Sequence, residues 1–188
     1  MKNGLKVLLY SDGFANLALG MIGPIYAIFV EQIGGDILDA SWAYFTYMFT
    51  SGVVMYLISK WEDRSKHKEK LVFYGYLLTS LGCLLYIFVY NQTTLLITQV
   101  ILGLSMAILS PVFDSVYSHY VIKKEEASNW GIWEAMNYMV AAVAAIIGGY
   151  IANTFGFKIL FLIMFLVSVL GTIKSLSLSG DKKYLDTV

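Results

Sequence analysis

The sequence predicts an all-α membrane protein with six transmembrane helices, arranged as a 3+3 inverted repeat with both termini cytoplasmic. Hydrophobic residues make up 58% of the chain and charged residues only 14%, whereas soluble domains carry roughly 25% charged residues. Six apolar stretches each reach the length of about 20 residues that a helix needs to cross a bilayer. When each stretch is taken as a span, 12 of the 13 Lys and Arg residues fall on one side.

Spans one to three form the first predicted repeat, residues 1–92. Span one covers residues 6–31 and ends before the turn Gly34-Gly35-Asp36. Span two covers residues 40–60 and span three residues 70–90, with the charged run 62–70 between them. These spans must be helices, because a lipid-exposed backbone needs its hydrogen bonds satisfied internally and no strand-like alternation of polarity is present.

Spans four to six form the second predicted repeat, residues 93–180, and residues 181–188 form a cytoplasmic tail. The spans cover residues 94–121, 130–153 and 157–178, separated by the polar segment 123–129 and by Gly156. Pro111 lies about as deep in span four as Pro24 lies in span one, and each proline removes a backbone hydrogen bond. Kinks at matching positions of two inverted repeats are typical of a transporter's binding region, although two prolines can also match by chance.

The basic residues fix the predicted direction of the spans. Cytoplasmic loops collect Lys and Arg, so we expect the basic side to be cytoplasmic in a cell membrane, plasma or inner. Lys158 alone lies on the other side. The twelve residues on the basic side are Lys2, Lys6, Lys60, Arg64, Lys66, Lys68, Lys70, Lys123, Lys124, Lys174, Lys182 and Lys183.

Polar residues recur at helical spacing on spans one, four and five. A carboxylate inside a span costs about 2.5–3.5 kcal/mol on insertion scales, so Asp12, Asp114 and Glu134 should each face a cavity or a partner, where they can exchange protons. The candidate substrate- or proton-binding residues are Asp12, Asn16, Gln99, Ser110, Asp114, Tyr117, Glu134 and Asn137. On span five, Ala141, Ala145 and Gly149 form a small-residue row that lets another helix approach closely.

Several of these residues also have structural interpretations. Glu134 can serve as a clamp to Arg64 or a loop lysine, and Asp114 can be a satisfied polar residue at the hairpin of spans four and five. His119 fits an interfacial position better than a ligand position. The lone Cys83 excludes an intramolecular disulfide.

Other classes of function find little support. No zinc-binding spacing and no phosphate-binding Gly-x-x-x-x-Gly-Lys run is present, so we expect no cofactor, no metal and no enzymatic activity. A rhomboid-type protease needs Gly-x-Ser-Gly, and Gly103-Leu104-Ser105-Met106 fails at its last position. Topology explains the basic loop, so we expect no nucleic-acid partner. A six-helix membrane partner or assembly protein without transport activity remains the alternative.

Four segments together resemble motifs of the major facilitator superfamily. The loop from Ser59 to Lys68 resembles the signature between helices two and three, with Asp63, Arg64 and Lys68 matching. The segment from Gly148 to Phe161 is similar to the junction of helices five and six. Gly23-Pro24 fits helix one. The segment from Gln99 to Gly103 resembles the helix-four motif, although Gln99 replaces an arginine associated with proton transfer.

The resemblance implies half of a twelve-helix secondary transporter. The chain begins with Met and ends with a hydrophilic stretch, so we expect a complete small protein or a half. We expect it to pair with a second copy, or with another six-helix half, around a cavity lined by helices one and four. Asp63 and Arg64 would latch the cytoplasmic face. The pair would move a small-molecule substrate, cationic or neutral, by alternating access with possible proton coupling.

Overall fold

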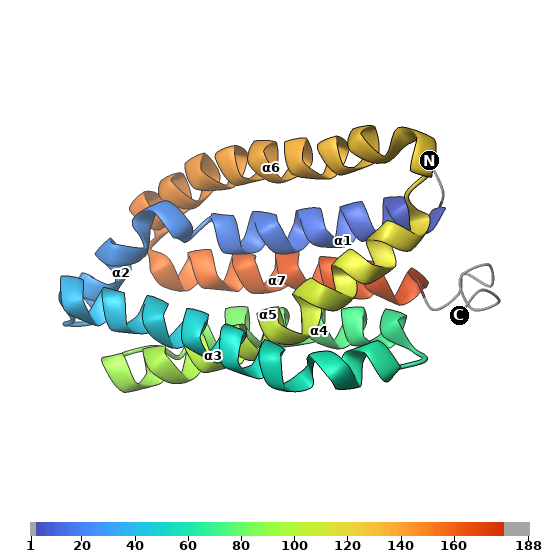
Figure 1. The fold of residues 1–188 in the computed structure, drawn as a ribbon. Helices are drawn as coiled ribbons and strands as arrows, with labels where there is room; N and C mark the ends of the chain where they lie inside the picture. The colour runs from blue at the N-terminus through green and yellow to red at the C-terminus, as the bar shows by residue number, and fades with distance from the viewer. Residues whose placement is uncertain (1–2, 179–188) are drawn as a thin grey trace.

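The computed structural model describes residues 3–178, and this part of the chain is helical and contains no strand (Figure 1). The helices are α1 (Asn3–Gly20), α2 (Tyr26–Gln32), α3 (Ile37–Arg64), α4 (Lys68–Tyr86), α5 (Gln92–Tyr120), α6 (Glu126–Phe155) and α7 (Phe157–Ser175). Short 3-10 turns lie at η1 (Gly23–Ile25), η2 (Lys123–Glu125) and η3 (Leu176–Leu178). The predicted all-α fold is confirmed, and the predicted tail lies outside the described residues.

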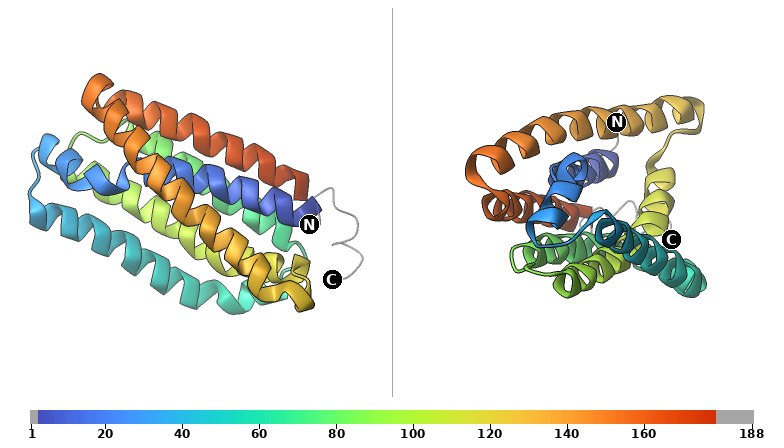
Figure 2. Two further views of the ribbon diagram at one scale, coloured as in Figure 1. Left: turned by 90° about the horizontal axis from the view of Figure 1, so that it is seen from above. Right: turned by 90° about the vertical axis from the view of Figure 1, so that its left-hand side faces the viewer.

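Six helical segments correspond to the six predicted spans, because α1, η1 and α2 together form span one. In residues 3–178, four segments are long and apolar enough to cross a membrane: Asn3–Gln32, Gln92–Tyr120, Lys123–Phe155 and Phe157–Leu178. Helices α3 and α4 fall short of that apolar threshold. They nevertheless pack lengthwise on α5, so they belong to the same bundle (Figure 2).

Two capping boxes fix where α3 and α5 begin. Asp36 accepts a hydrogen bond from the Asp39 backbone N–H (2.9 Å), and the Asp39 carboxylate accepts one from the Asp36 N–H (3.0 Å). Asn91 and Thr94 repeat this arrangement at the start of α5. The Gln92 side chain then donates to the Asp39 carbonyl (3.0 Å), which ties the two turns together at one end of the bundle.

The two predicted repeats share one core. Helix α7 of the second repeat packs against α1 and α4 of the first, and α5 packs against α3 and α4. One buried cluster centres on Phe29, Tyr86 and Phe161, near the end of the bundle that holds α2. Another centres on Tyr76, Phe113 and Tyr117 toward the opposite end. The repeats therefore interleave and do not form separate bodies.

Helices α3 and α6 lie on opposite flanks of the bundle, with α1, α4, α5 and α7 between them (Figure 2). Helix α6 contacts α1 and α7, whereas α3 contacts α5 and α2. Only Asn129, Ala144 and Gly148 of α6 are buried, and only Ala43, Ser51 and Glu62 of α3. Both helices therefore present long uncovered apolar faces.

The basic residues within 3–178, apart from Lys158, gather at one end of the bundle, and Lys2, Lys182 and Lys183 lie outside the described residues. Helix α1 begins and α7 ends there, and the α3–α4 turn and η2 lie at the same end (Figure 1). Lys158 lies at the other end, at the start of α7. The charge asymmetry read from the sequence is therefore an asymmetry of the folded bundle.

Candidate functional site

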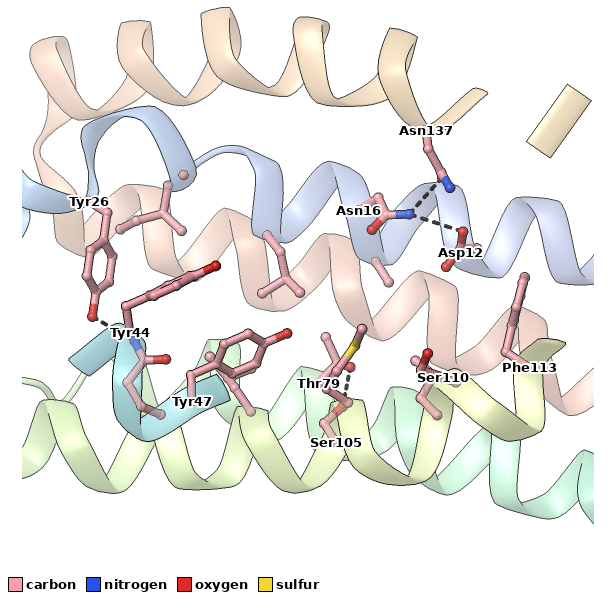
Figure 3. A pocket seen from close by; sticks show the side chains of 18 of the residues that line it. Asp12, Asn16, Tyr26, Tyr44, Tyr47, Thr79, Ser105, Ser110, Phe113 and Asn137 are labelled. Atoms are coloured by element: carbon pink, nitrogen blue, oxygen red, sulfur yellow. Dashed lines mark hydrogen bonds between the residues drawn. The ribbon is translucent and has the colours of Figure 1, made fainter. Parts of the chain in front are cut away.

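A cavity of about 540 Å³ lies between α1, α2, α3 and α5, with contributions from α4 and α6. Figure 3 shows side chains from α1 and α5 facing each other across it. Its lining residues are Asp12, Ala15, Asn16, Leu19, Ile22, Gly23, Tyr26, Tyr44, Tyr47, Thr79, Tyr86, Gln99, Leu102, Ser105, Met106, Leu109, Ser110, Phe113, Asp114, Trp133 and Asn137. Helices one and four, as numbered from the sequence, supply over half of this lining.

A break in the first span shapes one wall of the cavity. Gly20, Gly23 and Pro24 all disfavour a continuous helix, and the chain passes through the η1 turn between α1 and α2. Pro24 occupies the start of that turn, where its missing N–H costs little. Gly23 lines the cavity. Irregular backbone at membrane depth is tolerated where it lines a cavity or is covered by protein, and the break meets this condition.

Close packing of α6 holds this break in place. A Cβ added at Gly148 would lie 2.0 Å from the Met21 carbonyl oxygen, and one added at Gly20 would lie 2.9 Å from the Ala144 Cβ. Ala144 therefore packs against Gly20 at the end of α1, with the Ala141 Cα also close to it, and Gly148 packs against Met21 in the break. In the predicted row, Ala145 and Gly149 each follow Ala144 and Gly148 by one residue, so they are turned by about 100° around α6. A Cβ added at Gly149 would meet nothing within 4 Å, so part of that row is open.

Asp12 is the centre of a polar cluster at one end of the cavity, which we call the Asp12 cluster: Asp12, Asn16, Tyr76, Trp133 and Asn137. Trp133 Nε1 donates to Asp12 Oδ2 (2.7 Å), and Asn16 Nδ2 donates to the same oxygen (3.1 Å). Tyr76 donates its hydroxyl to Oδ1 (3.4 Å). Asn16 also donates to Asn137 Oδ1 (2.8 Å), which joins α1 to α6 (Figure 3).

The donors of the Asp12 cluster are all neutral. Within residues 3–178, no salt bridge involves Asp12, and no Lys, Arg or His lines the cavity. A carboxylate in a low-dielectric site that lacks a cationic partner is costly unless a proton or another cation compensates it. The Asp12 cluster can therefore hold the Asp12 carboxylate in an orientation in which it binds either a proton or another cation.

Gln99 organises the other end of the cavity, in a group that we call the Gln99 triad: Gln99, Tyr26 and Tyr86. Its Nε2 donates to the Tyr26 hydroxyl (2.7 Å) and to the Tyr86 hydroxyl (2.9 Å). This triad connects α5 to α2 and α4. Gln99 stands where the resembled motif has an arginine, and here it makes two neutral hydrogen bonds.

Ser110 and Asp114 follow on the cavity side of α5. Ser110 is partly buried and Asp114 is exposed. Fifteen positions separate Gln99 from Asp114, which places them about 22 Å apart along the helix at 1.5 Å per residue. The cavity is therefore elongated, with carboxylates toward the basic end of the bundle and tyrosines toward the other.

Six of the eight candidate binding residues line the cavity: Asp12, Asn16, Gln99, Ser110, Asp114 and Asn137. Tyr117 does not, because it is fully buried and donates to the Asn129 carbonyl (2.6 Å), which ties α5 to α6. Glu134 does not either. It is exposed on the outer face of α6, and no ion pair of Glu134 occurs in the described part of the chain.

The predicted latch and kink residues lie away from the cavity or at its wall. Asp63 and Arg64 are exposed at the end of α3, and neither makes an ion pair with another described residue. Lys68 joins this loop to α5 by donating to the Ser115 hydroxyl (2.9 Å). Pro111 lies inside α5, which continues as one helix through it.

Sequence reasoning missed two partners of Asp12. Neither Trp133 nor Tyr76 is among the candidate binding residues selected from the sequence. Trp133 and Asn137 are four residues apart and share a helix face, whereas Glu134 is turned about 100° away from Trp133. Glu134 and Trp133 are both within about one helical turn of Asn137, at three and four positions, so helical spacing alone does not choose between them.

Three comparisons with known proteins agree with this architecture. The family model described as Major Facilitator Superfamily matches residues 11–183. An uncharacterized MFS-type transporter of Methanocaldococcus jannaschii is 24% identical over 163 residues, which cover 85% of this chain and 41% of that protein. The crystal structure of the peptide transporter POT in complex with sulfate matches with a TM-score of 0.77 and 19% identity, over 94% of this chain and 38% of that one. The chain thus spans about two fifths of the length of either protein.

Proposed function

We propose, from the premise that this chain belongs to the major facilitator superfamily, that it forms one half of a membrane transporter. The transporter moves a small solute by alternating access, as two six-helix bundles rock about a shared cavity. We propose further that the second half is another copy of this chain in the same orientation. Proton coupling at Asp12 belongs to the same proposal.

The exposure of Asp114 carries the proposal. This carboxylate lies six residues before the end of α5, lines the cavity and is exposed in the single chain. Against lipid, a charge in a span costs about 2.5–3.5 kcal/mol on insertion scales. A second six-helix bundle across the cavity would place Asp114 in an enclosed, hydrated chamber and would remove that cost.

A two-fold axis along the membrane normal specifies which helices would meet. The axis passes in front of the cavity and exchanges its two flanks. Helix α3 of one copy then faces α6 of the other, because these helices lie on opposite flanks of each bundle (Figure 2). The open position at Gly149 on α6 would let the partner's α3 approach closely there.

Pairs of cysteines test this arrangement in a Cys83→Ser background, in which the one natural cysteine is absent. Gly52 lies 15 positions from the start of α3, and Ala141 lies 14 positions from the end of α6. Both are therefore about 22 Å from the same end of the bundle. Both residues are exposed, so cysteines there should be tolerated.

Mixing Gly52→Cys protein with Ala141→Cys protein in lipid should give a crosslinked dimer. Either variant alone should crosslink weakly, and native mass spectrometry in lipid should show two copies. A single copy, or crosslinks between identical positions only, would contradict the proposed pair. Stable capture of a different membrane protein in place of a second copy would favour the non-transport partner, or a distinct second half.

A further inference from the structure

The two ends of the cavity differ in chemistry, and this difference indicates a class of substrate for the proposed transporter. The inference rests on the proposed function, because it concerns what the same cavity binds. The end of the cavity that lies toward the basic end of the bundle holds the carboxylates of Asp12 and Asp114, and we call it the acidic end of the cavity. The other end holds the Gln99 triad with Tyr44 and Tyr47. Between them Leu19, Leu102 and Leu109 supply apolar wall, and the hydroxyls of Thr79 and Ser105 are hydrogen-bonded to each other.

The acidic end selects for positive charge. Asp12 receives three neutral donors, which orient its carboxylate but leave any negative charge uncompensated. Asp114 adds a second acid on the facing helix. Among the lining residues within 3–178 there is no basic side chain, so the cavity wall carries acidic groups only. An enclosed surface of one sign concentrates ligands of the opposite sign.

The far end selects against a second charge. Gln99 is 5% exposed, and both of its side-chain hydrogen bonds use Nε2. Its carbonyl oxygen has no donor among the described side chains, although Gln99 lines the cavity. Gln99 Oε1 therefore has free acceptor capacity that suits a neutral donor, and no basic side chain lies in the described cavity lining to hold a ligand carboxylate.

Aromatic side chains flank the route between the ends. Tyr44 and Tyr47 of α3 face the cavity from one side, and Phe113 lies near Asp12 from the α5 side (Figure 3). Ring faces and apolar walls bind the body of an organic cation by contact area and by cation–π attraction. A small inorganic cation would leave most of a 540 Å³ cavity empty.

We propose that the cavity binds an amphipathic organic monocation. Its ammonium or other cationic group contacts the Asp12 carboxylate, and its apolar body extends along α5 toward Tyr44 and Tyr47. A neutral hydrogen-bond donor on that body would reach the Gln99 carbonyl oxygen. Zwitterions and anions are poor ligands, because the cavity offers their carboxylate no basic partner.

Equilibrium binding of radiolabelled tetraphenylphosphonium to the protein in lipid nanodiscs tests this assignment. Asp12→Asn should weaken binding about 10- to 100-fold, because the phosphonium loses the Coulomb attraction of a partly buried carboxylate. The matched control is Glu134→Gln, which removes an acid from a span but outside the cavity, and it should bind like the natural chain. Empty nanodiscs report partition into lipid, which is subtracted.

A second variant guards against misfolding of Asp12→Asn. Ser110→Lys leaves the Asp12 cluster intact and places a positive charge in the cavity, so it should also weaken binding of the cation. An excess of a zwitterionic dipeptide should not displace the bound cation. Equal binding by the natural chain and Asp12→Asn, or displacement by the dipeptide, would overturn the proposal.

Failure of the proposed substrate class can be distinguished from failure of the proposed pairing. A crosslinked α3–α6 pair that does not bind the phosphonium would remove the substrate class and leave the transporter half in place. Binding that depends on Asp12, in a protein that stays a single copy, would keep the cation site and remove the paired transporter.

Discussion

The two proline-bearing spans face each other across the cavity, yet they are built differently. The first is broken into α1 and α2 by the η1 turn, and its acid, Asp12, is held by three donors from three other positions. The facing helix α5 runs unbroken through Pro111, and its acid, Asp114, is exposed. The broken span thus carries the organised polar site, while α5 supplies a continuous wall.

Local sequence explains this difference. Pro24 follows Gly20 and Gly23, which are poor helix formers, so the chain leaves the helix at low cost. Pro111 follows Ala107, Ile108, Leu109 and Ser110. Ala107 and Leu109 favour a helix, and Ile108 is tolerated in one. The lost hydrogen bond to Ala107 is then absorbed inside α5. Equal proline depth therefore does not produce equal breaks.

Neutralising the two acids should give the largest contrast between these spans. Asp12→Asn should reduce tetraphenylphosphonium transport into proteoliposomes about 100-fold, because the oriented carboxylate is lost. Asp114→Asn should reduce it less than about 10-fold, since Asp114 has no such cluster around it. The two variants should be compared at equal reconstitution. Equal losses would show that the Asp12 cluster adds nothing to the charge itself.

Filling the contact between α6 and the break should destabilise the fold. Gly148→Ala places a Cβ against the Met21 backbone, which cannot move as a flexible side chain can. We expect a loss of about 2 kcal/mol in the free energy of unfolding in detergent, within the range for overpacking. Gly149→Ala, at an open position, should be neutral or stabilising by up to ~1 kcal/mol. If both variants behave alike, α6 does not support the break.

Removing each proline should distinguish the two spans by stability. Pro111→Ala restores an N–H that can bond to the Ala107 carbonyl, so we expect a gain of about 1–2 kcal/mol. Pro24→Ala should change stability by less than ~0.5 kcal/mol, because Pro24 stands at the start of η1, where no helical bond is lost. Thermal unfolding of both variants in one detergent gives the comparison. A larger gain for Pro24→Ala would reverse the explanation given for the break.

The smallest effect concerns the start of α5. Asn91→Ala removes the capping acceptor of the Thr94 N–H (2.9 Å), and we expect a loss of about 1 kcal/mol. The comparison is Glu125→Ala at the start of α6, where the exposed N-cap makes no side-chain cap hydrogen bond, so no capping loss is expected there. Unfolding measured by loss of far-ultraviolet helicity reports both. No change for Asn91→Ala would mean that tertiary packing alone fixes the start of α5.

The fold could be predicted from the sequence because each of the patterns used concerns a whole helix or its end. Long apolar stretches, the basic residues at alternate connections and the turns at Gly34 and Gly156 each mark a span or its end. The sequence was weaker for the site, which depends on helix rotation. Glu134 and Trp133 are neighbours in the chain, yet only Trp133 reaches Asp12. Tyr117 shares the Gln99–Asp114 spacing, but its hydroxyl bonds to α6.

The central claim is that the acid-bearing faces of α1 and α5 line an aqueous chamber completed by a second copy. Spin labels at Ser110, on the cavity wall, and at Ile146, 77% exposed on α6, test it most directly in liposomes. We predict that a water-soluble nickel relaxation agent reaches the Ser110 label and that oxygen dissolved in lipid reaches the Ile146 label. Oxygen-dominated relaxation at Ser110, matching Ile146, would place that face against acyl chains and contradict the account.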